Sequence, residues 1–297
     1  MNPFTVNPTH VFAFPRSGTT SLSEWLGKER ASHEYNMTAV ARLNSDIGKL
    51  DPLSWKRFLT ARELGLAGKT DITTNLFVFA KRYIEKTECR PLILLRNPVA
   101  WCASFFDMFA GIGMGLRESP CTADTISGLH AWGHPPWGSQ RLRAILMETR
   151  FLDRRELQEQ ITAEFLLEWC DHAKSLLDLS INHHLPYITT SMFNDQYRIS
   201  QFFPNCQDLT DRPIPRSNTG QHSQLIASII MQFVAVDLQL SGNAADDRAA
   251  IEHFHGVLKT HRLRNPPLPA KLSALSDRST RGPTMSDAIA LRPRAAG

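Results

Sequence analysis

Residues 16–21 concentrate side chains that bind anions, in the order Arg16, Ser17, Gly18, Thr19, Thr20 and Ser21. The arginine carries a fixed positive charge, each hydroxyl can donate a hydrogen bond, and the glycine lets the backbone turn closely. The apolar run Val11–Phe14 precedes this segment, and an amphipathic run over residues 22–26 follows it. A buried strand, a small-residue loop and a helix in this order point backbone N–H groups at a phosphate.

A second arginine stands at the end of a second apolar run. Pro91–Leu95 is continuously apolar, which is typical of a strand buried on both faces of a parallel sheet. Arg96 follows at the carboxyl end, where open α/β sheets bind ligands, and a helix after Asn97-Pro98 carries Ser104. A guanidinium can hold a phosphate with two hydrogen bonds and a serine adds one more donor. The two segments together predict two anion-binding loops on one sheet.

The pattern of strands and helices around these residues predicts an α/β fold of three layers, with a central, mainly parallel sheet flanked by helices. The 297 residues allow one large domain with insertions or two small domains. A late strand is expected over residues 185–190. Helices are expected over residues 43–67, 76–86, 156–179, 221–238 and 244–261. In the first of these, Trp55, Phe58, Leu59 and Leu64 are expected on one apolar face.

Both anion-binding segments resemble motifs of sulfotransferases that use 3′-phosphoadenosine 5′-phosphosulfate (PAPS). Residues 15–20 match the 5′-phosphosulfate loop P-(K/R)-S-G-T-(T/S), and residues 96–104 match the 3′-phosphate motif R-(D/N)-P-x5-S. The loop is not a Walker A loop, since the first glycine and the Gly-Lys pair are missing. The resemblance implies a P-loop NTPase-like sulfotransferase fold, with PAPS as donor and 3′-phosphoadenosine 5′-phosphate (PAP) as product. The loop is most similar to the tyrosylprotein, heparan and bacterial branches.

The resemblance also implies catalytic residues. In the tyrosylprotein and heparan branches, a glutamate about 20 residues after the basic residue of the loop is the catalytic base; Glu34 has this placement, and His33 is the next candidate. A lysine some 26 residues before the 3′-phosphate arginine acts on the transferring sulfonate, and Lys69 stands 27 residues before Arg96. Arg16 would add a second catalytic charge. From the residues alone, a solvated loop at residues 33–34 and a surface lysine at 69 stay open as alternatives.

Two later segments are expected to complete the site. The polar loop over residues 212–220 offers Arg216, Ser217 and Asn218 as donors to the 3′-phosphate, although it lacks the R-K-G-x-x-G-x-W-K pattern of the cytosolic branch. Residues 109–139, rich in glycine and proline, predict an acceptor-binding lid within a single domain of residues 1–264. His130 and His134 in this lid are alternative bases. Residues 265–297 lack periodicity and predict a disordered tail.

The composition excludes several classes of protein. The formal net charge is only +4, so no basic face for nucleic acid is expected. The five cysteines are scattered without a C-x-x-C pair, which favours reduced thiols over disulfides or a metal site. No signal segment and no apolar run of 18 residues occurs, which predicts a cytoplasmic protein without a membrane span. The oligomeric state has no signature in the sequence.

The expected activity is transfer of the sulfuryl group from PAPS to a hydroxyl group (alcohol, sugar or phenol) of a small-molecule acceptor. The mechanism would be an in-line displacement assisted by a general base. Two alternatives stay open at this point. One is a nucleotide-dependent kinase with a degenerate P-loop, and the other is a catalytically silent PAP-binding homologue.

Overall fold

Five parallel strands form the central sheet, in the order β2-β3-β1-β4-β5. The computed structural model describes residues 8–14, 16–36, 39–40, 51–86, 89–111, 155–203, 206–216, 231 and 238–264. The strands are β1 (Thr9–Ala13), β2 (Ala31–His33), β3 (Thr70–Ile72), β4 (Arg90–Leu95) and β5 (Tyr187–Thr189). Because all pairs are parallel, every strand ends at the same edge of the sheet.

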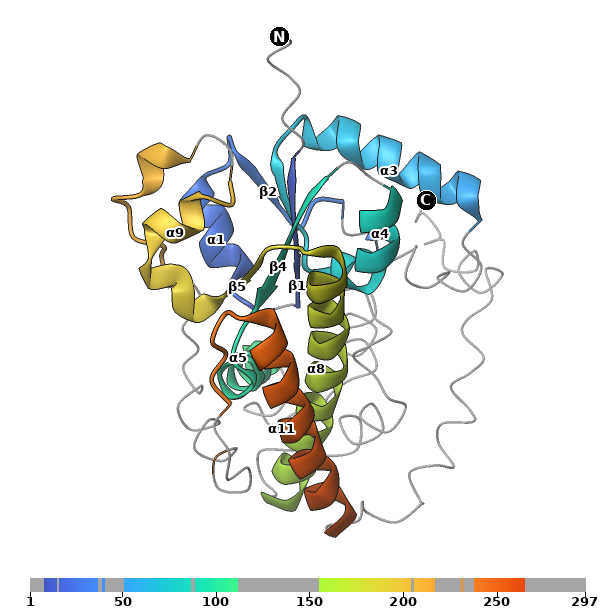
Figure 1. Cartoon of the computed structure of the whole chain (residues 1–297), viewed down its shortest axis with the longest axis vertical. Helices are drawn as coiled ribbons and strands as arrows, with labels where there is room; N and C mark the ends of the chain where they lie inside the picture. The colour runs from blue at the N-terminus through green and yellow to red at the C-terminus, as the bar shows by residue number, and fades with distance from the viewer. Residues whose placement is uncertain are drawn as a thin grey trace, which may run out of the picture.

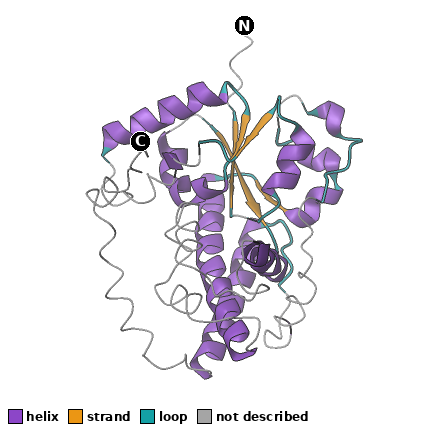
Figure 2. Ribbon diagram, turned by 180° about the vertical axis from the view of Figure 1, so that it is seen from behind, coloured by secondary structure: helices purple, strands orange, loops and turns teal. Residues whose placement is uncertain are grey.

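Helices cover both faces of this sheet, so the chain has the expected three-layer α/β architecture (Figures 1 and 2). On one face lie α1 (Thr19–Leu26) and α9 (Gln196–Ser200). On the other lie α3 (Pro52–Leu66), α4 (Ala80–Lys86) and α8 (Arg155–His183). The remaining described helices are α5 (Pro98–Gly111), α11 (Ala244–Arg264) and the 3-10 helices η2 (Thr74–Phe79), η4 (Thr190–Asn194) and η5 (Gln207–Leu209).

Two apolar cores, one on each face, hold the layers together. Successive side chains of a strand point to opposite faces. Phe12 and Phe14 therefore pack with α3, α4 and α8, whereas Val11 and Ala13 pack with α1 and α9. The central strand β1 is buried along its whole length. This burial fixes the point at which the chain leaves β1 and enters the loop at Arg16.

The structure confirms the two long apolar strands and the helices that cover them, and it corrects some details. Leu64 does not join the apolar face of α3, because its side chain is 77% exposed. The predicted helix over residues 76–86 begins as the 3-10 helix η2 and continues as α4. The short strands β2 and β3 were not predicted. Apart from residues 231 and 238, the predicted helix over 221–238 lies outside the described residues.

Hydrogen bonds of the Asn97 side chain connect the turn after β4 to the segment that leads into α11. Its amide donates to Gln239 Oε1, and its Oδ1 accepts from the backbone N–H of Leu240 at 3.1 Å. Asp247, in the first turn of α11, accepts from the backbone N–H of Ser241 at 2.7 Å and from Tyr187 Oη at 3.0 Å. These bonds tie α11 and the segment before it to the turn after β4 and to the start of β5.

The described cysteines, Cys89, Cys102, Cys170 and Cys206, are free thiols. Within the described ranges, no helix combines the length and the apolar character that crossing a bilayer requires.

Candidate functional site

The loops that follow the strands bring most of the predicted site residues to the carboxyl edge of the sheet. β1 and β4 are in register from Thr9 and Arg90 to Ala13 and Leu94, so the chain leaves both strands side by side at Arg16 and Arg96. His33, at the end of β2, pairs with Ile72 at the end of β3, so Glu34 leaves the sheet beside Thr73. Two separate parts of the edge therefore carry ionisable groups.

The loop after β1 has the backbone of an anion-binding turn. Arg16 (φ 69°) and Gly18 (φ 87°) are in the left-handed region, and the Ser17 N–H donates to Phe14 O at 3.2 Å. Gly18 caps α1 without a side-chain hydrogen bond, and no acidic residue stands in the first turn. Ser17 Oγ is buried and has no hydrogen-bond partner in the described part of the chain. A helix N-terminus without a side-chain cap and a buried hydroxyl without a described partner fit a bound anion.

Arg16, Arg96 and Ser104 meet at this loop. Arg16 Nε donates to Ser104 Oγ and to Ser104 O, each at 3.2 Å, and Arg96 Nη1 donates to Arg16 O at 3.1 Å. Burial and the neighbouring charge of Arg16 lower the pKa of Arg96 from its ordinary value. No carboxylate among the described residues lies within ion-pair distance of Arg96. The charge of Arg16 disfavours the charged form of Arg96, which favours an anionic ligand beside Arg96.

At Gly18 the loop packs closely against a neighbouring element. A Cβ added there would lie 2.9 Å from Thr190 Cγ2 and 3.0 Å from Phe193 Cε2, so η4 packs directly against the loop backbone. The sequence did not indicate that residues 190 and 193 line the loop. Their contact explains why glycine is needed here for space as well as for its positive φ.

We expect Gly18→Ala to cost more free energy of anion binding at the loop than free energy of unfolding. The left-handed backbone alone costs a substituted residue about 1–2 kcal/mol, and the clash with Thr190 and Phe193 displaces the loop in addition. Gly68→Ala is the control, because Gly68 also has a positive φ (80°) but a Cβ there meets nothing within 4 Å. Urea unfolding and calorimetric titration with PAP measure both effects. Equal losses of PAP affinity in the two variants would contradict the assignment.

Glu34 has the environment of a general base. Its backbone adopts φ 55°, its Oε1 accepts from Thr74 Oγ1 at 2.7 Å, and its Oε2 is buried without a hydrogen-bond partner in the described chain. Burial raises the pKa of the Glu34 carboxyl to about 7, against hydrogen bonds from Thr74 that act in the opposite direction. A carboxyl with this pKa can accept a proton at neutral pH and hold it.

His33 lies between Glu34 and the loop. Its Nε2 is 3.7 Å from Glu34 Oε1 and 3.4 Å from Thr19 Oγ1. Burial lowers the pKa of His33, which favours the neutral ring. This arrangement connects the carboxylate to the N-terminal turn of α1 through one imidazole. Both candidates for the base are thus on the side of β1 where β2 and β3 lie.

The structure does not bring Lys69 to this edge. Lys69 precedes β3, its Nζ donates to the carbonyl oxygen of Lys28 at 2.9 Å, and β3 runs parallel to β1. Lys69 therefore lies at the amino end of the sheet, opposite the Arg16 loop. At about 3.3 Å per residue, even a three-residue strand separates the two ends by about 10 Å. Thr73 and Thr74 occupy the carboxyl end of β3 instead, and we leave Lys69 out of the proposed site.

The structure describes only some of the remaining predicted residues. Thr20 is half-buried and Ser21 is buried in the first turn of α1, whereas Arg216 is exposed at the end of a described segment. Ser217, Asn218, His130 and His134 lie outside the described residues, as do residues 112–139 of the predicted lid and the tail over 265–297. Their predicted roles stay predictions.

Within the described ranges, no group of three or more His, Cys, Asp and Glu side chains could hold a metal ion. Comparison of the chain with family models, with curated proteins and with solved structures finds no match.

Proposed function

We propose that this chain is a PAPS-dependent sulfotransferase that acts on a hydroxyl group of a small-molecule acceptor. The observation that carries the proposal is that Arg16, which follows β1, is hydrogen-bonded both to Arg96 at the end of the neighbouring strand β4 and to Ser104 of α5. These are the residues of the two motifs that resemble the phosphosulfate and 3′-phosphate sites of that family.

The loop and its surroundings fit a ligand with several anionic groups. The buried Ser17 hydroxyl, the uncapped N-terminus of α1 and the Gly18 backbone would hold the 5′-phosphosulfate. Arg96 and Ser104 would hold the 3′-phosphate, and Arg16 stands between the two groups because it contacts Ser104 directly. The division of the two anionic groups among these side chains follows the resemblance.

The reaction requires charge compensation and one proton acceptor. In the displacement, the acceptor oxygen bonds to sulfur as the bond from sulfur to the 5′-phosphate oxygen breaks. Arg16 would offset the charge that grows on the leaving oxygen. Glu34 would take the proton of the acceptor hydroxyl at Oε2, which has no hydrogen-bond partner in the described chain, while Thr74 holds Oε1. His33 is the alternative acceptor of this proton. Positioning and fixed charge supply most of the rate enhancement in such transfers.

Binding of PAP, tested together with turnover of PAPS, decides between this proposal and its alternatives. We expect calorimetric titration to show tighter binding of PAP than of ATP. We also expect release of PAP from PAPS to require an acceptor, identified from a panel of alcohols, sugars and phenols. Preference for ATP would indicate the kinase with a degenerate loop. Tight binding of PAP with no transfer to any acceptor class would contradict the enzyme and support a silent binding protein.

A further inference from the structure

Tyr35, the residue after Glu34, is held at both of its backbone polar groups. Its N–H donates to Thr73 Oγ1 at 3.1 Å, and its carbonyl oxygen accepts from Arg62 Nη1 at 2.8 Å. Arg62 comes from α3 and Thr73 from the end of β3, so two different elements fix one peptide segment. Neither residue belongs to the motifs described above.

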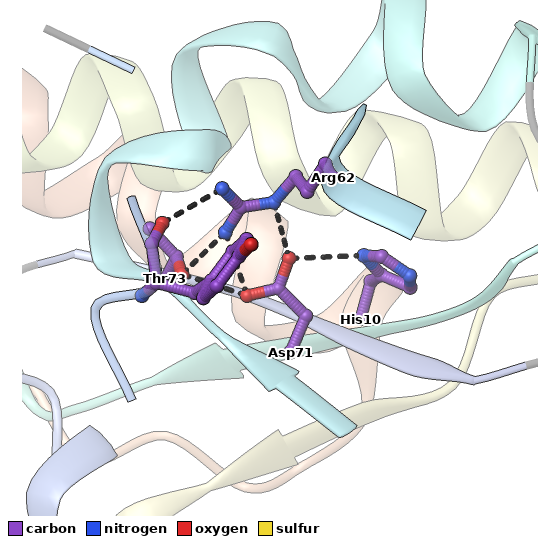
Figure 3. Close-up of polar contacts among 5 residues, drawn as sticks. His10, Arg62, Asp71 and Thr73 are labelled. Carbon is purple, nitrogen blue, oxygen red and sulfur yellow. Dashed lines mark hydrogen bonds and ion pairs between the residues drawn. The ribbon is translucent and has the colours of Figure 1, made fainter. Parts of the chain in front are cut away.

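Arg62 and Thr73 are themselves parts of a buried cluster with Asp71 and His10 (Figure 3). Arg62 Nε and Nη2 donate to the two Asp71 oxygens at 2.6 and 2.8 Å, and Thr73 Oγ1 donates to Asp71 Oδ1 at 2.7 Å. His10 Nδ1 lies 3.3 Å from Asp71 Oδ2. Burial opposes ionisation of Asp71, but the contacts with His10 and Arg62 outweigh it and lower its pKa to about 2. A buried pair with these bonds is a rigid anchor, because displacing either partner leaves an unpaired charge.

The Tyr35 side chain is held as well. Its ring lies over the Arg62 guanidinium, with 5.4 Å between Cζ of the arginine and the ring centroid. A Cβ added at Gly65 of α3 would overlap the Tyr35 hydroxyl and lie 2.5 Å from its Cζ. Tyr35 therefore fits into space that only a glycine on this helix leaves open.

Glu34 needs such support because its backbone is strained. Besides Glu34, four described residues other than glycine have a positive φ: Arg16, Asn36, Ala67 and His184. Ala67 and His184 follow the ends of α3 and α8, and asparagine tolerates this conformation, so those three have ordinary explanations. A strained glutamate persists only where its surroundings over-determine it, and such strain collects at functional sites.

We propose that Arg62, Asp71 and Thr73 form a clamp on Tyr35 that positions the Glu34 carboxylate for proton transfer. The inference rests on the proposed function, since it assigns positioning residues for the base of that reaction. Thr73 holds the backbone after Glu34, and Thr74 holds Oε1 of its side chain, so two consecutive threonines fix both ends of the residue. The charged and titratable groups that act on Glu34 are His33 on β2, Asp71 on β3 and Arg62 on α3.

The first test compares Thr73→Val with Thr73→Ser. Valine removes the oxygen that accepts from Tyr35 and Arg62, whereas serine keeps it. Carbon-13 NMR titration of the Glu34 carboxyl, assigned with Glu34→Gln, reports the position of that group without any substrate. We expect the Glu34 pKa to fall toward the ordinary glutamate value in Thr73→Val, since the released carboxylate reaches water, and to return in Thr73→Ser. We expect kcat of PAPS transfer to fall about 10- to 100-fold in the valine variant, with little change in KM.

The second test displaces Tyr35 from the clamp without removing a polar group. Gly65→Ala pushes the Tyr35 ring from its place on α3, while alanine favours the helix itself. Gly256→Ala on α11 is the matched control, because its added methyl meets nothing within 4 Å. We expect the Glu34 titration to shift in Gly65→Ala and to stay unchanged in Gly256→Ala.

The outcomes separate this inference from the proposed function. If Thr73→Val and Gly65→Ala lower the melting temperature but leave the Glu34 titration unchanged, the cluster is only structural and the inference is overturned. If the titration shifts as expected but the wild-type protein does not transfer sulfuryl groups, the clamp stands and the proposed reaction fails.

Discussion

Arg96→Ala is expected to reduce the affinity for PAP by about 10²- to 10⁴-fold and to reduce PAPS turnover below detection. Hydrogen bonds to charged groups contribute about 1.5–3 kcal/mol each, and a guanidinium can make two of them to one phosphate. Arg96 is partly buried beside Arg16 and the uncapped end of α1, where a phosphate is screened less than in water. Titration calorimetry with PAP measures the loss directly.

A simple loss of folding would not give the same pattern. Burial and the Arg16 charge oppose the charged form of Arg96, so its removal relieves a repulsion in the free protein. Because the variant also loses the hydrogen bond to Arg16 O, we expect the melting temperature of ligand-free Arg96→Ala to stay close to that of the wild type. The increase in melting temperature that PAP causes in the wild type should disappear.

Two further variants sharpen this experiment. Arg96→Lys keeps the charge but loses the planar fork, so an intermediate affinity is expected. Arg57→Ala removes an exposed arginine of α3, outside the proposed site, and it should leave PAP affinity unchanged. PAP affinity in Arg96→Ala within about threefold of that of Arg57→Ala would remove Arg96 from the site.

The sequence predicted those parts of the fold whose signal is local. The continuous apolar runs of β1 and β4 identified buried strands, and they fixed Arg16 and Arg96 at their ends. The i, i+3 and i+4 pattern of α8 identified the long helix in the same way. The three-residue strands β2 and β3 carry too few residues for any periodicity. They acquire their conformation from pairing in the sheet, which is a tertiary effect.

Because β3 was not predicted, the sequence did not show which edge of the sheet Lys69 occupies. The spacing from Lys69 to Arg96 agrees with the resemblance, but spacing does not give the direction of the intervening strand. Once β3 runs parallel to β1, Lys69 lies at one edge of the sheet and Thr74 at the other. The pairing of Arg62 with Asp71 was hidden for a similar reason, because the exposed character of α3 gave no sign that one of its arginines is buried.

Glu34→Gln is the second substitution with a large expected effect. General bases contribute about 10²- to 10⁴-fold to rate, and we expect kcat for PAPS transfer to fall by this factor. Glutamine keeps an oxygen that can accept from Thr74 Oγ1 but cannot take a proton from the acceptor. Binding of PAP should be unchanged, because none of the groups assigned to the nucleotide contacts Glu34. Turnover within about tenfold of the wild type would transfer the role of base to His33 or to a lid histidine.

The pH dependence gives an independent measure of the same carboxyl. Burial raises the pKa of Glu34 to about 7, and the base must be ionised to act. The rate constant kcat/KM should therefore rise with pH and level off above about 7, and Glu34→Gln should lose this limb. A wild-type profile that is flat between pH 5 and 8 would contradict the assignment of Glu34 as the base.

Stability should vary with pH in the opposite direction to activity. A raised folded-state pKa means that the folded protein holds the proton more tightly than the unfolded chain does. The resulting stabilisation is fully present below pH 4.5, the ordinary value for this carboxyl, and is lost as the pH rises through about 7. Glu34→Gln carries no charge at any pH, so it should be more stable than the wild type above pH 7 and similar to it near pH 4. Urea unfolding of both proteins at pH 4.5 and 8 tests this difference. Catalysis and stability thus make competing demands on one side chain, as expected where a fold keeps a strained, buried carboxylate ready to take a proton.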